Sequence, residues 1–152
     1  PPPPGLAGRP LATLRHLVCA SPRYLAERGH PQHPRDLEHH ACITLGEDER
    51  DRHWRFERAG EAAMVAVRGR YVANHSEVRL EAALSQLGIG SLPGFTARAA
   101  LARGDLMTVL PDWEHKNSYA GTAWVLYPSH RFLPAKLRVW IDHLVEGFAG
   151  VE

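Results

Sequence analysis

The chain has 152 residues, of which 44% are hydrophobic and 23% charged, and its net charge is +1 with the histidines neutral. This length can bury the core of one domain, and the balanced charge gives no electrostatic basis for nucleic-acid binding. No apolar run reaches the roughly 20 residues that a membrane-spanning helix needs, so we expect no membrane association.

Residues 1–10 are rich in proline and glycine and show no periodicity, which predicts a linker or the edge of a larger protein. Strands and helices then alternate, and a charged turn is predicted at 46–52. The first half of the chain predicts a strand at 11–20, a helix at 22–28, a helical turn at 35–40, a strand at 42–45, and a hairpin of strands 54–57 and 63–67.

The second half of the chain continues this alternation. It predicts a strand at 71–73, a helix at 76–87, a strand at 89–92, a helix at 95–102, strands at 106–110 and 122–127, and a helix at 134–148, with a polar loop at 112–118. The helix at 76–87 has an apolar face with i, i+3, i+4, i+7 spacing, made of Leu80, Ala83, Leu84 and Leu87. Asn74 is its expected N-cap. The pattern predicts an α/β domain with a mixed sheet.

Six segments, in this order, resemble the C-terminal part of the effector-binding domain of LysR-type transcriptional regulators. They are LVCASPRYLAERG, HPRDLEHHACITL, HWRFERAG, VAVRGRYVANHSEVRLEAALSQLGIGSLPGF, LARGDLMTVLPDW and AWVLYPSHRFLPAKLRVWIDHLVEGF. No single segment is specific, and the order and spacing of all six carry the resemblance.

The resemblance implies a fold like that of type 2 periplasmic binding proteins, in which two crossover strands join two α/β lobes around a ligand cleft. Residues 11–152 would then be a partial effector-binding domain. The complete second lobe would cover about 18–113, and a crossover with the C-terminal strand and helix of the first lobe would cover about 118–148.

The family implies a bacterial, cytoplasmic module that binds a small-molecule effector and modulates DNA binding and transcription. It also implies a homodimer or tetramer, with DNA contacted only through an N-terminal winged helix-turn-helix that lies outside this chain. No enzyme motif is present, so we expect neither catalysis nor a cofactor. Two alternatives stay open: a solute-binding receptor for transport, which shares this fold, and a truncated product that only associates with intact regulators.

The candidate ligand contacts cluster where the helix at 76–87 begins. Asn74, His75 and Ser76 match the family position at which a helix N-terminus faces the ligand. Free backbone N–H groups and the helix dipole stabilise an anion at such a terminus. The alternative is that Asn74 or Ser76 only caps the helix.

Three further residues are candidates with structural alternatives. Pro93 and Phe95 follow a buried strand in a turn that approaches the cleft in the family, but Phe95 could instead pack in the core and Pro93 could simply end the strand. Ser21 lies at a strand-to-helix turn and could face the ligand or only cap the helix at 22–28.

The remaining polar and aromatic residues receive structural interpretations. Histidines have no metal-site spacing, so we expect no metal, and His115 and His130 are expected to be solvated loop residues. Cys19 and Cys42 are expected to be buried free thiols. The four tryptophans are expected in the core or at an interface, with Trp140 as a possible partner contact.

Overall fold

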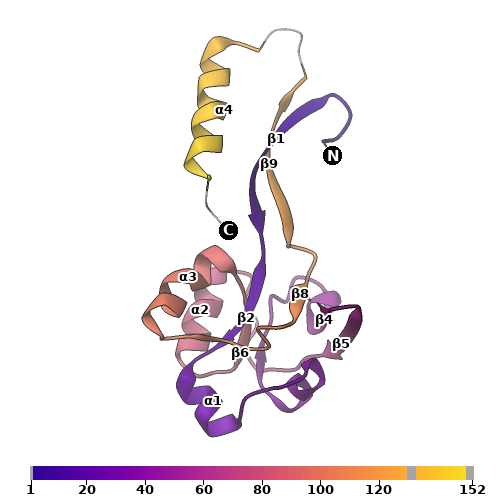
Figure 1. Cartoon of the computed structure of the whole chain (residues 1–152), viewed down its shortest axis with the longest axis vertical. Coiled ribbons are helices and arrows are strands. Elements are labelled where there is room, and N and C mark those ends of the chain that lie inside the picture. Colours follow the sequence, from indigo (N-terminus) through magenta and orange to yellow (C-terminus); the bar gives the residue numbers. More distant parts are fainter. Residues whose placement is uncertain (1, 130–132, 150–152) are drawn as a thin grey trace. The chain divides into compact units, whose positions relative to one another are not determined.

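The computed structural model describes residues 2–129 and 133–149. The chain divides into two compact units (Figure 1). The larger unit runs from Arg15 to Tyr119, and the smaller unit combines the residues up to Leu14 with those from Ala120 onward.

A four-stranded mixed sheet forms the centre of the larger unit. Its strand order is β3-β6-β2-β7, and the strands are β2 (His16–Ala20), β3 (Cys42–Ile43), β6 (Ile89–Pro93) and β7 (Met107–Thr108). β3 runs parallel to β6, whereas β2 is antiparallel to both of its neighbours. The sequence prediction of a mixed α/β sheet is therefore confirmed.

The inner strands of this sheet contribute to a core cluster on each face. Successive side chains of a strand point to opposite faces, so neighbouring residues divide between the two clusters. In β2, Val18 and Ala20 pack in one core cluster while Cys19 packs in the other. In β3, Cys42 and Ile43 divide between the same two clusters. Cys19 and Cys42 are thus buried free thiols, as predicted.

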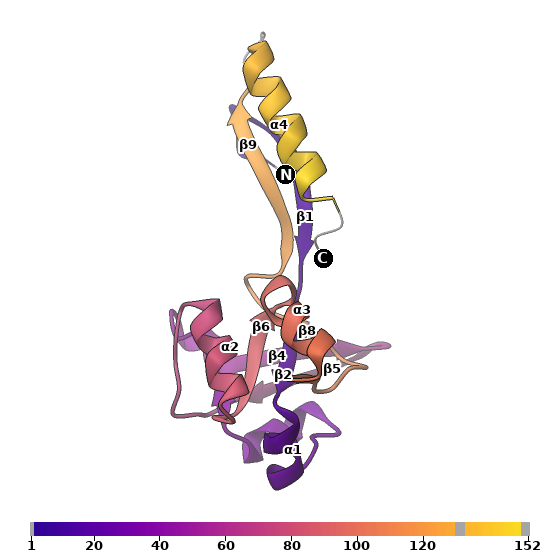
Figure 2. The same ribbon diagram turned by 90° about the vertical axis from the view of Figure 1, so that its left-hand side faces the viewer.

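Helices α2 (Ser76–Leu84) and α3 (Gly94–Arg103) lie on the same side of β6, to its left in Figure 1 and on the side that faces the viewer in Figure 2. Small side chains let them approach the sheet closely, since Ala83 and Ala97 are fully buried there. α3 ends at Gly104, which has the left-handed conformation that favours glycine at a helix C-terminus.

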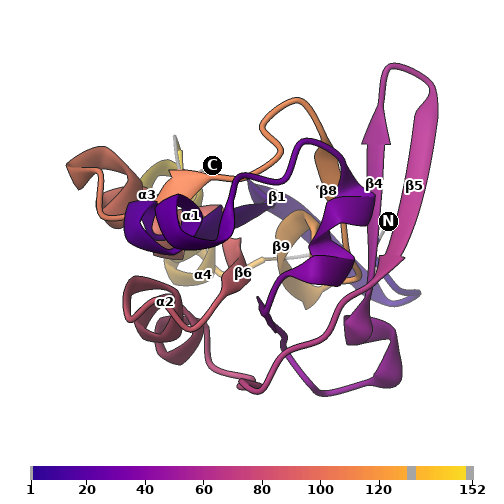
Figure 3. The same ribbon diagram turned by 90° about the horizontal axis from the view of Figure 1, so that it is seen from below.

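The second face is covered by short helical segments and a three-stranded sheet (Figure 3). The helical segments that contribute buried side chains there are α1 (Pro22–Arg28) and η1 (Pro34–His39), whereas η2 (Glu49–Arg52) has no buried residue and leads into the three-stranded sheet. The sheet has the order β5-β4-β8, with strands β4 (His53–Arg58), β5 (Glu61–Ala66) and β8 (Glu114–Lys116). The β4–β5 hairpin confirms the predicted one, and Trp54 and Trp113 are buried as predicted.

In its described residues, the smaller unit consists of a long two-stranded antiparallel ribbon and one helix. β1 (Leu6–Leu14) pairs with β9 (Gly121–Pro128), and α4 is Ala135–Gly147. An ion pair between Arg9 and Asp142 links β1 to α4, and Ile141 is buried. Trp124 and Trp140 are exposed, so an interface role for them stays a prediction.

Several predicted boundaries are wrong, each for a local reason. β1 begins at Leu6, inside the predicted linker, because antiparallel pairing with β9 orders this segment despite its prolines. α2 ends at Leu84, since Gln86 takes a positive φ of 66°, and Leu87 is exposed rather than on the core face.

The predicted strand at 71–73 is reduced to one bridge between Thr44 and Val72. The predicted loop at 112–118 contains β8, and the predicted turn at 46–52 contains η2.

Candidate functional site

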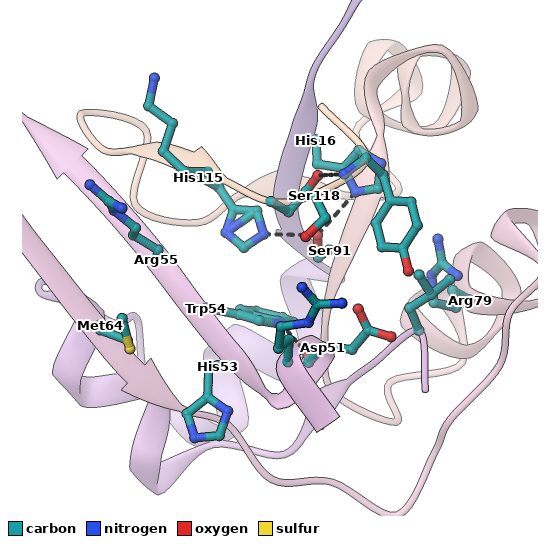
Figure 4. A pocket seen from close by; sticks show the side chains of 15 residues that line it. His16, Asp51, His53, Trp54, Arg55, Met64, Arg79, Ser91, His115 and Ser118 are labelled. Carbon is teal, nitrogen blue, oxygen red and sulfur yellow. Dashed lines mark hydrogen bonds between the residues drawn. The ribbon is translucent and has the colours of Figure 1, made fainter. Parts of the chain in front are cut away.

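A cavity of about 520 Å³ opens in the larger unit, and all fifteen residues that line it lie between His16 and Tyr119 (Figure 4). They come from β2, η2, β4, β5, α2, β6 and β8 and from the segments that follow β3 and β8. The volume falls within the range of roughly 300–1,000 Å³ that is typical of small-molecule sites. We call this cavity the Arg79 pocket, after the buried cation in its wall.

A chain of hydrogen bonds joins two histidines through a serine at this pocket (Figure 4). Ser91 Oγ lies 3.3 Å from His16 Nδ1 and 3.2 Å from His115 Nε2. The hydroxyl has one hydrogen, so Ser91 can donate to at most one of the two imidazoles, and at least one imidazole N–H must donate to Ser91. The three residues come from β2, β6 and β8, so the two sheets of the unit fix their geometry jointly.

His16 and His115 are both neutral near pH 7. Burial, and secondly the neighbouring Arg79 guanidinium, lower the pKa of His16 to about 4. Burial, and secondly His16, lower the pKa of His115 to about 4. His115 packs against the rings of Trp54 and Phe56, with centroid distances of 5.3 and 5.0 Å. The prediction that His115 is a solvated loop residue is therefore wrong: it lies in β8 and only 6% of it is exposed.

Arg79 is the buried cation of the pocket, with 3% of its surface exposed. Its Nη1 donates to the carbonyl oxygen of Ala73 at 2.8 Å, and its Nε is buried without a hydrogen-bond partner in the described part of the chain. Burial lowers the pKa of Arg79, and the carboxylates of Asp51 and Glu47 partly oppose that effect. A guanidinium stays protonated in proteins even so, which leaves a positive charge in the pocket wall.

The arginines and the lysine that also line the pocket are paired with carboxylates; Arg50 and Arg55 are exposed and Lys116 is half-buried. Arg50 binds Asp48, with its Nε 2.9 Å from an Asp48 oxygen. Arg55 Nη2 lies 2.8 Å from Glu57. Lys116 Nζ lies 2.6 Å from Glu114 and 3.7 Å from Glu57.

The three predicted contacts at the start of α2 lie next to the pocket along the chain, but they do not line it. His75, not Asn74, is the N-cap residue, and it makes no capping bond through its side chain. The predicted cap role of Asn74 is wrong because the helix starts one residue later than that role requires. Asn74 and His75 are exposed and Ser76 is half-buried.

The other three predicted contacts are spread over the larger unit and also do not line the pocket. Ser21 caps α1 by accepting a hydrogen bond from the Tyr24 N–H at 3.2 Å. Pro93 is buried at the end of β6 and precedes α3. Phe95 is 51% exposed, so the alternative that it packs in the core is wrong.

Sequence reasoning missed four polar residues of the pocket that are buried or half-buried, which are His16, Arg79, Ser91 and His115. A signal for one of them was present. Arg79 stands four positions before Ala83, on the apolar face of the helix. Arginine is rarely buried unless it has a partner, so its position on this face indicates a buried polar site. His16, Ser91 and His115 carry no such signal, because only the tertiary structure brings them together.

Metal and membrane features are absent from the described ranges 2–129 and 133–149. No group of three or more metal-ligating side chains gathers there. Within the same ranges no helix is long and apolar enough to cross a bilayer. His130 lies outside the described residues, so the prediction that it is solvated stays untested.

The sequence matches a family model described as "LysR substrate binding domain" over residues 1–149. It is 50% identical over 145 residues to a probable HTH-type transcriptional regulator, LtrA, of Klebsiella pneumoniae, covering 95% of this chain and 47% of that protein. It is 33% identical over 144 residues to the HTH-type transcriptional regulator PtxR of Pseudomonas aeruginosa, covering 93% and 45%. The chain therefore spans about half the length of these curated relatives.

Solved structures agree with this assignment. The full-length Vibrio cholerae virulence activator AphB, described as a member of the LTTR protein family, aligns with a TM-score of 0.83 and 28% identity, covering 97% of this chain and 50% of that one. The CrgA regulatory domain of Neisseria meningitidis aligns with a TM-score of 0.77 and 29% identity, covering 95% and 70%. The predicted fold class, like that of type 2 periplasmic binding proteins, is confirmed. The relatives are transcriptional regulators rather than enzymes, and they lend no support to the alternative of a transport receptor.

Proposed function

The chain belongs to the LysR substrate-binding domain family, and from this premise we propose that it senses a small anionic effector in the Arg79 pocket. Binding there modulates how the regulator that carries this domain occupies DNA and controls transcription. The DNA contacts belong to a winged helix-turn-helix outside this chain, and the regulator works as a homodimer or tetramer.

One observation carries the proposal: Arg79 is a buried cation without a carboxylate partner among residues 2–129 and 133–149. In the residues that the structure describes, no acidic side chain forms an ion pair with it, and its Nε lacks any hydrogen-bond partner. Burying an uncompensated charge costs several kcal/mol unless something pairs with it. A ligand carboxylate that enters the pocket would satisfy both the charge and the free N–H.

The segment before α2 is the second proposed part of the site. The Nη1 bond from Arg79 to the Ala73 carbonyl ties the guanidinium to the residue directly before Asn74. A ligand that moves Arg79 therefore also acts on Asn74, His75 and Ser76, which we keep as proposed ligand contacts. Pro93, Phe95 and Ser21 also stay proposed contacts, supported only by the family resemblance.

Signalling follows from a difference in affinity between two conformations. A ligand shifts a conformational equilibrium only as far as it binds one state more tightly than the other. Because the pocket joins two sheets and α2, a ligand in it would stabilise one arrangement of β2, β6 and β8. We propose that the regulator passes this preference to its DNA-binding domains.

The proposal is tested by thermal unfolding of the 152-residue chain with small carboxylates, alongside the variant Arg79→Met and the matched control Arg23→Met. Arg23 lies on α1 with its side chain 73% exposed, outside the pocket. We expect acids that stabilise the chain and the control to lose their effect on Arg79→Met. Equal stabilisation of all three proteins would contradict the proposal. In the full regulator, the same acids should change operator binding.

A further inference from the structure

The described charges around the Arg79 pocket can stabilise one added negative charge, but not a second. Of the arginines and lysines that line it, three are engaged by carboxylates of this chain: Arg50, Arg55 and Lys116. Their side chains are 81%, 57% and 39% exposed, so water also solvates their charges. Arg79 alone combines burial with the lack of a carboxylate partner among the described residues.

The pocket histidines add no positive charge at neutral pH. His16 and His115 share the Ser91 hydroxyl, and the burial that lowers their pKa values keeps both imidazoles neutral. They therefore offer hydrogen bonds to a ligand but no ionic attraction.

Acidic groups already act on Arg79. Asp51 lines the pocket, and one of its oxygens accepts hydrogen bonds from the backbone N–H groups of Glu47 and Asp48 at 2.8 and 3.0 Å. Glu47 accepts a hydrogen bond from the Tyr119 hydroxyl at 3.3 Å. Both carboxylates partly stabilise the Arg79 charge from a distance. A second negative charge on a ligand would be repelled by these carboxylates, and the described residues that line the pocket offer no second unpaired cation to offset that repulsion.

The rest of the pocket wall includes apolar and aromatic side chains. Trp54 is buried in it, Tyr119 stacks on His16 with ring centroids 6.5 Å apart, and Leu45 and Met64 complete this part of the lining. An uncharged hydrocarbon body gains by leaving water for such a wall, whereas a charged group there would lose its hydration.

We propose that the Arg79 pocket selects monocarboxylates with a compact apolar body and discriminates against the corresponding dicarboxylates. The carboxylate pairs with Arg79, and the body lies against Trp54 and Tyr119. This inference rests on the proposed anion-sensing function and adds the charge class of the effector to it. For matched acids that differ by one carboxylate, we expect the diacid to bind at least about tenfold more weakly.

The test is calorimetric titration of the 152-residue chain at pH 8 and fixed ionic strength with two matched pairs of acids, benzoate with terephthalate and hexanoate with adipate. Arg79→Met is titrated in parallel. Asp51→Asn removes one negative charge but keeps an oxygen that can accept the two backbone bonds. Glu38→Gln, on an exposed part of η1 outside the pocket, is the control for a general loss of negative charge. If Asp51→Asn does not fold, Glu47→Gln tests the same repulsion.

We expect at least one monoacid to bind tenfold or more tightly than its diacid, and to lose this binding in Arg79→Met. Asp51→Asn, but not Glu38→Gln, should improve diacid binding several-fold more than monoacid binding. Diacids that bind as tightly as the monoacids in an Arg79-dependent way would overturn this inference and leave the proposed function standing. If none of the four acids binds in an Arg79-dependent way, both are overturned.

Discussion

Arg79 donates a hydrogen bond from Nη1 to the carbonyl oxygen of Ala73 at 2.8 Å, which ties the middle of α2 back to the segment before it. The residue is 3% exposed, yet in the described ranges it has no carboxylate partner. A protein that only needed stability would place an apolar side chain here, since a buried unpaired charge lowers stability. The cost is explained if the charge serves to bind a ligand.

The variant Arg79→Met should show that this charge is not needed for folding. Methionine fills a similar volume, removes the buried charge, and loses one hydrogen bond worth about 1 kcal/mol. We expect the free energy of unfolding to change by less than about 1.5 kcal/mol in urea titration, with either sign. A loss above about 4 kcal/mol would mean that Arg79 mainly supports the fold.

The buried histidines predict a loss of stability on acidification. Burial holds the pKa values of His16 and His115 near 4, below the ordinary value of about 6.5 that applies in the unfolded chain. Between these values the unfolded state binds more protons, so stability rises with pH from about 4 to 6.5 and is lost as pH falls through that window.

This pH effect is measured as the midpoint of thermal unfolding between pH 4.5 and 7.5. The variant His115→Gln should flatten the curve, because glutamine keeps hydrogen-bonding groups but does not titrate there. His30→Gln, at an exposed position, is the control. An unchanged slope in His115→Gln would contradict the assignment of His115 as a buried neutral group.

Two small substitutions separate capping from ligand contact. Ser21→Ala removes the bond that Ser21 Oγ accepts from the Tyr24 N–H, and should lower the free energy of unfolding by about 1 kcal/mol. Asn74→Ala should leave it nearly unchanged, because the structure gives the N-cap position of α2 to His75. A loss near 1 kcal/mol in Asn74→Ala, measured by urea unfolding, would restore the cap role that the sequence predicts for it.

Gly69 should be intolerant of any side chain. A Cβ atom there would lie 1.8 Å from the backbone carbonyl oxygen of Cys42, whose N–H bonds to the Arg68 carbonyl at 2.8 Å. Gly69→Ala must therefore push this segment away from β3, and we expect it to cost more than about 2 kcal/mol. Gly147→Ala is the matched control, since no atom of the described residues lies within 4 Å of its added Cβ and alanine favours the helix. Both variants are compared by thermal unfolding.

The sequence correctly predicts those helix ends and turns that local residue preferences determine. Proline and glycine punctuation places α1 and the end of α3 within about a residue, and the Ala59-Gly60 turn places the β4–β5 hairpin. Short elements are predicted less well. β8 was missed because its three residues are polar, and pairing with β4 rather than their own preference makes them a strand.

The pocket itself could be predicted only in part. The family resemblance indicates a ligand site near the start of α2, and Arg79 is close to it in sequence. The polar group made of His16, Ser91 and His115 could not be predicted in this way. These residues are separated by 75 and 24 positions in the sequence and meet only through sheet pairing. His115 shows the limit most clearly, because its burial depends on Trp54 and Phe56, about sixty residues earlier in the chain.

The central claim is tested most directly by the ¹H–¹⁵N resonance of the Arg79 Nε–H, assigned by its loss in Arg79→Lys, while benzoate or hexanoate is added to the 152-residue chain at pH 8. If the pocket holds a carboxylate on this free donor, the resonance moves with saturation, and the exposed Arg23 Nε–H does not follow it. A resonance that stays in place while an acid measurably binds the chain would show that the anion sits elsewhere, and would contradict the account.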